Sequence, residues 1–209
     1  MTRAVRGRRP MSERRRELQR LEISRAAARL FREQGVAATS GEQIADAVGL
    51  SVRTLWRYFR SKESCVEPVV ARSLDAFLAT VRSCPPDRSL AEHLLAAREE
   101  AGPADTADAV AALAVYGMSR DEPALRAVWL VVYERAEAVL ADLVAARTGR
   151  PPTDVAVRVR AAAIAAAVRI STEELAAVVL ADPSTPLDTG ETRRRLAEAL
   201  RVATGEPQA

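Results

Sequence analysis

Residues 39–62 read TSGEQIADAVGLSVRTLWRYFRSK, and within them two short helical patterns meet at a tight turn. Ser40 and Gln43 have the spacing of a capping box, which marks a helix start. Gly49 accepts the left-handed backbone that ends a helix sharply, and Ser51 can cap the helix that follows. The segment therefore predicts two helices joined by a glycine turn.

The second of these helices has two unlike faces. Leu55 and Phe59 stand one turn apart and are expected to point into a core. The residues left to face outward include no acid: Val52, Arg53, Thr54, Arg57 and Tyr58. A supporting helix is predicted upstream, because apolar residues recur at helical spacing from Ile23 until Gly35 ends the run. An ordinary helical bundle could contain such a hairpin, with the arginines as a solvated face.

The charge distribution favours a nucleic-acid partner. The chain has 31 basic and 28 acidic residues, a net charge of only +3. Residues 1–62, however, contain 15 basic and 6 acidic residues, a net charge of +9, whereas the remainder has 16 and 22, a net charge of −6. A basic module on an acidic body is expected where one part faces phosphates.

Residues 23–62 resemble the N-terminal domain of the TetR/AcrR family of transcriptional regulators. The resemblance rests on AAARLFREQG (26–35), TSGEQIADAVGLS (39–51) and RTLWRYFRSKE (53–63). Two positions depart from the family pattern. Gly41 stands where a side chain is usual, which could loosen the helix start or remove a base contact, and Trp56 stands where tyrosine is commoner.

The resemblance also implies residue roles at the DNA. Phosphate contacts are expected from Ser40, Thr54, Trp56, Tyr58 and Lys62. Arg53 is the expected base reader, because arginine can bond guanine in a bidentate fashion. Val52 could touch a thymine methyl group, and Arg57 could serve base or backbone. The arm of residues 1–16 is rich in arginine and either enters a minor groove or forms a disordered solubilising tail.

Periodicity and helix breakers predict an all-α chain with two domains. After the arm, residues 17–62 form the helix-turn-helix domain, residues 63–204 a helical effector-binding and dimerisation domain, and residues 205–209 a tail. Pro68 should kink or break the linking helix. Further helices are expected at 89–100, 105–118, 122–147, 153–180 and 191–203.

The second domain contains four aromatic residues, Phe77, Tyr116, Trp129 and Tyr133, and is otherwise built largely from alanine, valine and leucine. The candidate pocket residues are Phe77, Val81, Tyr116, Met118, Trp129, Val132 and Tyr133. The alternative is that Trp129 and Tyr133, one turn apart, simply fill the core. The family resemblance favours a pocket for a small-molecule effector, and the composition of the domain suggests that this effector is apolar or amphipathic.

Residues 155–180 are rich in alanine, and a thin helix allows close approach by a neighbour. In the resembling family the last two long helices form a homodimer interface. The candidate interface residues are Ala163, Ala167, Leu175, Leu196 and Leu200. The helix is not expected to span a membrane, because charged residues interrupt it.

Enzymatic function has little support in the sequence. His93 is the only histidine, and no phosphate-binding, dinucleotide-binding or metal-ligating motif is present. Cys65 and Cys84 are expected to be reduced thiols of a cytoplasmic protein. We therefore predict no catalytic residue, cofactor or metal. The expected function is that of a ligand-responsive regulator, which represses transcription as a dimer on a pseudo-palindromic operator in double-stranded DNA. The alternatives are a non-specific DNA-binding protein and a helical enzyme.

Overall fold

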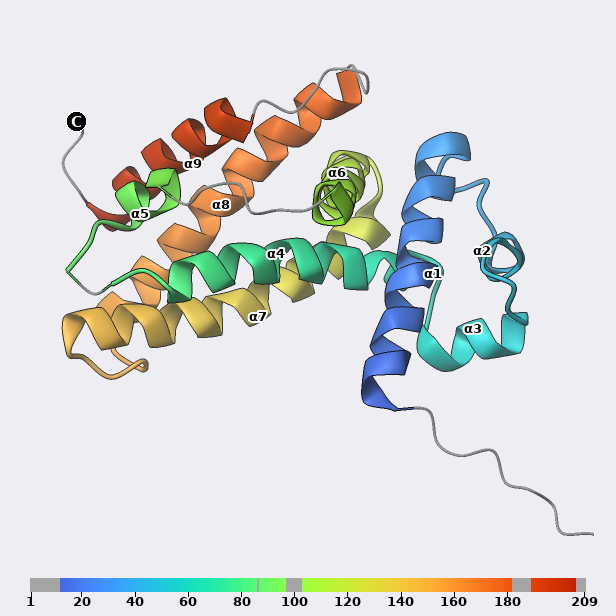
Figure 1. The fold of residues 1–209 in the computed structure, drawn as a ribbon, viewed down its shortest axis with the longest axis horizontal. Coiled ribbons are helices and arrows are strands. Elements are labelled where there is room, and N and C mark those ends of the chain that lie inside the picture. Colours follow the sequence, from blue (N-terminus) through green and yellow to red (C-terminus); the bar gives the residue numbers. More distant parts are fainter. Residues whose placement is uncertain (1–11, 86, 97–102, 182–188, 206–209) are drawn as a thin grey trace, which may run out of the picture.

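The computed structural model describes residues 12–85, 87–96, 103–181 and 189–205 (Figure 1). In these ranges the chain forms nine α-helices and one short 3-10 helix, and no strand. The elements are α1 (Glu13–Gln34), α2 (Gly41–Ala47), α3 (Val52–Tyr58), η1 (Glu63–Val66), α4 (Glu67–Arg82), α5 (Leu90–Ala96), α6 (Pro103–Met118), α7 (Pro123–Thr148), α8 (Val155–Ala181) and α9 (Thr189–Thr204). The predicted all-α fold is confirmed.

The first three helices form a small unit at one end of the molecule (Figure 1). Ile23 and Phe31 of α1 pack with Ile44 of α2 and Leu55 of α3, and all four side chains are at most 1% exposed. The capping box is present, because the Ser40 side chain accepts from the Gln43 backbone N–H while the Gln43 side chain accepts from that of Ser40. Gly49 has a φ of 64° and makes the predicted turn.

The segment that connects this unit to the body is not one continuous helix. The short η1 comes first and α4 begins at Glu67, so the break that Pro68 predicts is present. Pro68 lies in the first turn of α4, where its missing N–H costs no helical hydrogen bond. Val66 precedes the helix and supplies no side-chain cap. Ser24 of α1 replaces that cap, because its Oγ accepts from the backbone N–H of Val69 at 3.0 Å in a buried position. The start of α4 is therefore fixed to α1.

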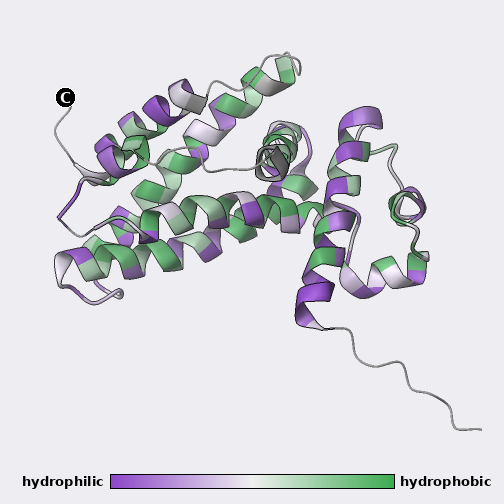
Figure 2. Ribbon diagram, in the orientation of Figure 1, coloured by the Kyte–Doolittle hydropathy of each residue, from purple (hydrophilic) through white to green (hydrophobic). Residues whose placement is uncertain are grey.

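The body is a helical bundle in which apolar faces pack inward (Figure 2). α4 packs along α7, and α8 packs against α6, α7 and α9. α5 contacts α9, and α6 contacts both α8 and α1. The helix bounds agree with the predictions to within a few residues, although α6 begins two residues earlier, at Pro103, because proline suits a first turn.

The N-terminal arm differs from its prediction over its last four residues. Residues 13–16 form the first turn of α1, where the carboxylate of Glu13 is favourable to the helix dipole. The rest of the arm, residues 1–11, lies outside the described residues, as do residues 97–100 of the predicted helix 89–100. None of the helices described is long and apolar enough to cross a membrane.

Candidate nucleic-acid interface and effector core

One face of α3 packs against the core of the small N-terminal unit, and the opposite face is exposed to solvent. Leu55 and Phe59 are 0% and 3% exposed, so they anchor the helix in the core. Ser51 caps its start, because Ser51 Oγ accepts from the backbone N–H of Thr54 at 3.3 Å and lies 2.9 Å from the Thr54 hydroxyl. Val52, Thr54 and Tyr58 are half-buried at the edges of this face.

The two arginines of α3 differ in their surroundings. Arg53 is exposed and makes no hydrogen bond or ion pair with any residue the structure describes. The Arg57 guanidinium lies 5.5 Å from the centre of the Tyr58 ring, a cation–π distance that restrains it against its own helix. Arg53 is therefore the more available of the two for a base edge.

Gly41 and Trp56, the two departures from the family pattern, are in contact with each other in the structure. Gly41 is buried at the start of α2, and the indole of Trp56 on α3 covers it. A Cβ added at Gly41 would clash with Trp56 Cζ2 and lie 2.7 Å from its Cη2. Trp56 remains 42% exposed, so the indole also reaches the outer face. The indole of Trp56 can therefore pack against the start of α2 because Gly41 has no side chain.

Lys62 is turned toward the protein rather than outward. Its ammonium Nζ donates to the carbonyls of Val36 at 2.6 Å, Thr39 at 2.8 Å and Ala37 at 3.4 Å. These carbonyls belong to the connection between α1 and α2. All three ammonium hydrogens are therefore directed at backbone, which leaves the predicted phosphate contact of Lys62 without a spare donor in this conformation.

The Lys62 contacts continue into the start of α2. The hydroxyl of Thr39 donates to the carbonyl of Gly35 at 2.8 Å, and Gln34 Nε2 donates to Thr39 Oγ1 and to Gln43 Oε1, each at 3.1 Å. Gln43 in turn completes the capping box with Ser40. The hydroxyl of Ser40 accepts within the box, and it also interacts with the exposed side chain of Glu42, whose pKa is lowered first by its backbone hydrogen bond and then by Ser40.

Acidic residues that the sequence analysis did not single out join the DNA-binding unit to the body. Asp108 on α6, with a side chain only 3% exposed, accepts from Arg25 of α1 through Nε at 2.6 Å and Nη2 at 2.8 Å. Arg72 of α4 also pairs with Asp108, at 3.0 Å. Glu67 likewise pairs with Arg135 of α7 at 2.7 Å and with Arg20 of α1 at 3.8 Å. The only sequence signal for Asp108 was its place among alanines in a helix that contains one other acid, Asp105.

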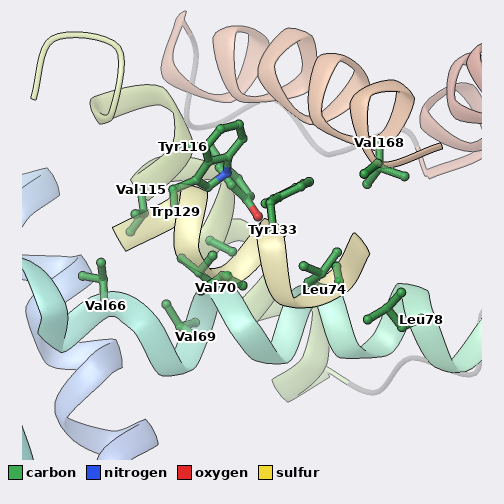
Figure 3. Packing of buried hydrophobic residues seen from close by; sticks show 14 of the residues in the cluster. Val66, Val69, Val70, Leu74, Leu78, Val115, Tyr116, Trp129, Tyr133 and Val168 are labelled. Carbon is green, nitrogen blue, oxygen red and sulfur yellow. The ribbon is translucent and has the colours of Figure 1, made fainter. Parts of the chain in front are cut away.

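Three of the predicted pocket residues, Tyr116, Trp129 and Tyr133, lie together in the core of the body (Figure 3). The rings of Tyr116 and Trp129 meet edge to face with centres 5.5 Å apart, and those of Trp129 and Tyr133 are 4.7 Å apart. All three residues are at most 6% exposed. Val81 and Val132 are buried in the same hydrophobic core, whereas Phe77 and Met118 are half-buried. In this conformation the aromatic cluster is packed core, and a ligand entering it must separate the rings.

The polar atoms of these three aromatic residues differ in whether they have a hydrogen-bond partner. The hydroxyls of Tyr116 and Tyr133 are hydrogen-bonded to each other, and burial raises the pKa of both. Both phenols are therefore neutral at ordinary pH. Trp129 Nε1, by contrast, is buried and has no hydrogen-bond partner among the described residues. A buried donor without an acceptor is costly, so this N–H is the one polar group of the three rings that is left to be satisfied.

The predicted dimer residues divide into two sets. Ala167 and Leu200 are 7% and 0% exposed in the single chain, because the neighbouring helices of the same subunit cover them. They offer a partner little surface. Ala163, Leu175 and Leu196 are half-buried and retain some. The apolar residues most exposed on α8 are others: Val155, Val159, Ile170 and Val178.

The fold and the outer face of α3 define the class of the protein, a helix-turn-helix DNA-binding protein with a helical body. Residues 23–69 match the family model described as bacterial regulatory proteins, tetR family, and residues 88–201 match the model of the MftR C-terminal domain. The chain belongs to the TetR family, whose members are transcriptional regulators and not enzymes.

Individual relatives agree with this assignment. The chain is 31% identical over 134 residues to the HTH-type transcriptional regulator TcmR of Streptomyces glaucescens, a match covering 61% of this chain and 59% of TcmR. It is 40% identical over 63 residues to the repressor KstR2 of Rhodococcus jostii (strain RHA1), covering 30% and 31%. Both matches span less than two thirds of the relative's length.

The fold extends beyond those matches. The crystal structure of the repressor FadR of Thermus thermophilus, in complex with lauroyl-CoA, superimposes with a TM-score of 0.56 at 20% identity. The superposition covers 91% of this chain and 95% of FadR. At this identity the likeness concerns the fold.

Proposed function

We propose that this protein represses transcription as a homodimer whose two α3 helices enter successive major grooves of a pseudo-palindromic operator. The observation that carries the proposal is the outer face of α3, where Arg53 is exposed and unpaired among the described residues while Leu55 and Phe59 fix the helix beneath it. A helix of this kind reads base edges with its exposed side chains, and half-sites then lie about 34–36 Å apart or at multiples of that spacing.

The remaining residues of the interface would position the DNA. We assign phosphate contacts to the hydroxyls of Ser40, Thr54 and Tyr58 and to the indole N–H of Trp56, because hydroxyl and N–H donors at the edge of a reading helix set register and orientation. Arg57 serves base or backbone, and Val52 a thymine methyl group. Lys62 instead fixes the start of α2 through its three carbonyl contacts.

The dimer contact is assigned to the outer stripe of α8. Val155, Val159 and Ile170 are 71%, 63% and 48% exposed, and Ala163 lies between them at helical spacing. A hollow of about 770 Å³ between α7 and α8 is lined by Val155 and Val159 and also by the charged residues Glu134, Glu137, Asp142 and Arg158. A second copy meeting this stripe would bury apolar surface that is otherwise left in water.

The effector is assigned to the aromatic core of the body. Its polar requirement comes from Trp129, whose buried N–H has no acceptor among the described residues, while its apolar requirement comes from the buried apolar side chains of the same core, which include Val81 and Val132. We infer an amphipathic molecule with an uncharged hydrogen-bond acceptor, such as a carbonyl, on an apolar body. The lauroyl-CoA bound by Thermus FadR contains such a group, an uncharged thioester carbonyl on an apolar acyl chain, although its coenzyme A part is charged; it is therefore a first probe.

Release from DNA would follow from separation of the rings. Tyr116 lies on α6, which also holds Asp108, and Asp108 is bonded to Arg25 of α1. A ligand that displaces α6 therefore acts on the helix that supports the DNA-binding unit. By linkage, a ligand that weakens operator binding must itself bind more weakly to the DNA-bound protein, by the same factor.

The experiment is a binding titration of the full chain against the DNA upstream of its own gene and against a shuffled duplex of equal length, each with and without lauroyl-CoA. The proposal expects binding to the natural duplex as a dimer, discrimination that persists at raised salt, and release by an effector. Equal affinity for both duplexes at every salt concentration would instead support the alternative of a non-specific DNA-binding protein.

A further inference from the structure

A hollow of about 530 Å³ lies between α1 and α6, at the junction of the DNA-binding unit and the body. It is separate from the aromatic core and from the outer face of α3. Small and apolar side chains form its lining on both helices, among them Ala28, Ala111 and Ala114. Its size is within the range of about 300–1,000 Å³ that is usual for small-molecule sites.

One rim of this hollow is strongly basic. Arg25, Arg29 and Arg32 all line it and all belong to α1, where spacings of four and three residues place them on one face. Asp108 is the only acidic residue among the lining residues whose side chains the structure describes. The rim therefore has an excess of positive charge over an apolar floor.

The pairing of these arginines shows where an anion would go. Asp108 is shared between Arg25 and Arg72, so both of these arginines already have a partner. Arg29 has an exposed partner, Glu33 one turn along the same helix, at 3.0 Å, and such surface pairs are weak. Arg32 is exposed and pairs with no residue that the structure describes. Arg29 and Arg32 are thus the groups available to a carboxylate.

We propose that the α1–α6 hollow is a second ligand site, which binds a small organic carboxylate through Arg29 and Arg32 and holds its apolar stem against the alanine floor. Two neighbouring guanidinium groups suit the two oxygens of a carboxylate. A ligand held there contacts α1 and α6 together and so binds one relative placement of these helices. Operator binding and carboxylate binding are then coupled, because α1 supports α2 and α3.

The test uses calorimetric titration of the full-length protein with sodium octanoate and with 1-octanol, which have the same chain length and differ in charge. The wild type is compared with Arg29→Gln/Arg32→Gln. The matched control is Arg14→Gln/Arg16→Gln, which removes the same charge from exposed positions on the same helix outside the hollow. A third variant, Trp129→Phe, removes the N–H of the aromatic core. Circular dichroism checks that each variant is folded.

The proposal expects octanoate to bind the wild type and the control equally, and to bind Arg29→Gln/Arg32→Gln at least about tenfold more weakly, since charge-assisted hydrogen bonds are lost. Octanol should bind far more weakly than octanoate. Three results would overturn it: no octanoate binding, equal binding to Arg29→Gln/Arg32→Gln, or equal affinity for octanol. Binding lost only in Trp129→Phe would place the ligand in the aromatic core, which would support the effector assignment and refute this one.

Discussion

Gly41 and Trp56 form one structural unit, because the indole of Trp56 occupies the space that a side chain at position 41 would need. The glycine starts α2 and the tryptophan lies in the middle of α3, so their contact sets how closely these helices approach. A tyrosine at position 56 would lack the second ring that covers Gly41. The two departures from the family pattern noted in the sequence are therefore structurally linked.

Substitution of Gly41 by alanine tests this unit. Because the indole is 42% exposed, it can swing outward, so we expect a loss of stability of only about 1 kcal/mol, at the low end for overpacking. Operator affinity should fall more clearly, because the displaced indole alters the outer face of α3. Chemical denaturation and DNA titration measure the two effects.

The double variant Gly41→Ala/Trp56→Tyr provides the control. The smaller ring removes the clash, and alanine is a better helix former than glycine by up to about 1 kcal/mol. The second substitution should therefore restore the stability lost in Gly41→Ala. If the two changes are additive instead, Gly41 and Trp56 are not energetically coupled, and the unit described above is incorrect.

Lys62 is the only lysine among 31 basic residues, and it stands where three carbonyl oxygens converge. A tetrahedral ammonium can serve three converging acceptors, whereas the planar guanidinium of arginine cannot do so in the same space. We expect Lys62→Arg to lose operator affinity nearly as much as Lys62→Met does, with a salt dependence close to that of the wild type. Fluorescence anisotropy at several salt concentrations measures both.

A phosphate-binding role for Lys62 gives the opposite pattern. Arginine would then be an adequate substitute, and only Lys62→Met would lose affinity, with its salt slope reduced by about one unit. Hydrogen exchange gives a second measurement, since loss of the three carbonyl contacts should increase exchange at the start of α2 in the free protein.

Asp108→Asn should weaken the junction between α1, α4 and α6. The carboxylate is buried, but Arg25 and Arg72 are 47% and 50% exposed and can turn to solvent, so we expect a loss of about 1–3 kcal/mol rather than the larger cost of a fully buried pair. The response of DNA binding to effector should fall as well. Asp75→Asn, an exposed change on α4, is the control. An unaltered effector response in a destabilised Asp108→Asn protein would show that Asp108 has only a structural role.

Cys65 should be chemically inert in the folded protein. Burial, with Glu63 nearby, raises the pKa of its thiol to about 12, so the reactive thiolate is scarce well beyond pH 8. Because the folded pKa exceeds the unfolded one, this group favours the folded state below about pH 9 and loses that contribution between pH 9 and 12. A thiol reagent at pH 8 should modify Cys65 only after denaturant is added, and rapid native-state labelling of Cys65 would refute the assignment.

Local features of the fold were predictable, and contacts between distant segments were not. The capping box of Ser40 and Gln43 and the turn at Gly49 depend on residues within one helical turn, so their spacing predicts them. The pair of Arg25 and Asp108 joins residues 83 positions apart, and no periodicity identifies such partners.

The dimer prediction shows the same limit. An apolar face on α9 correctly predicts that Leu200 is buried, but its pattern is the same whether helices of the same subunit or a second subunit cover it. Likewise Gly41 and Trp56 were each recognised as unusual residues. Their contact with each other depends on the angle and distance at which α2 and α3 cross. The apolar pattern of each helix, taken separately, does not predict that crossing.

The most direct measurement of sequence reading by α3 is selection of bound duplexes from a random DNA pool, performed in parallel with the wild type and with Arg53→Ala. The wild type should enrich a pseudo-palindrome with two equivalent half-sites. Arg53→Ala should lose discrimination at one base pair in each half-site, at a cost of about 1–3 kcal/mol on the selected operator. Enrichment of no motif by the wild type, or of the same motif with the same stringency by Arg53→Ala, would contradict the account.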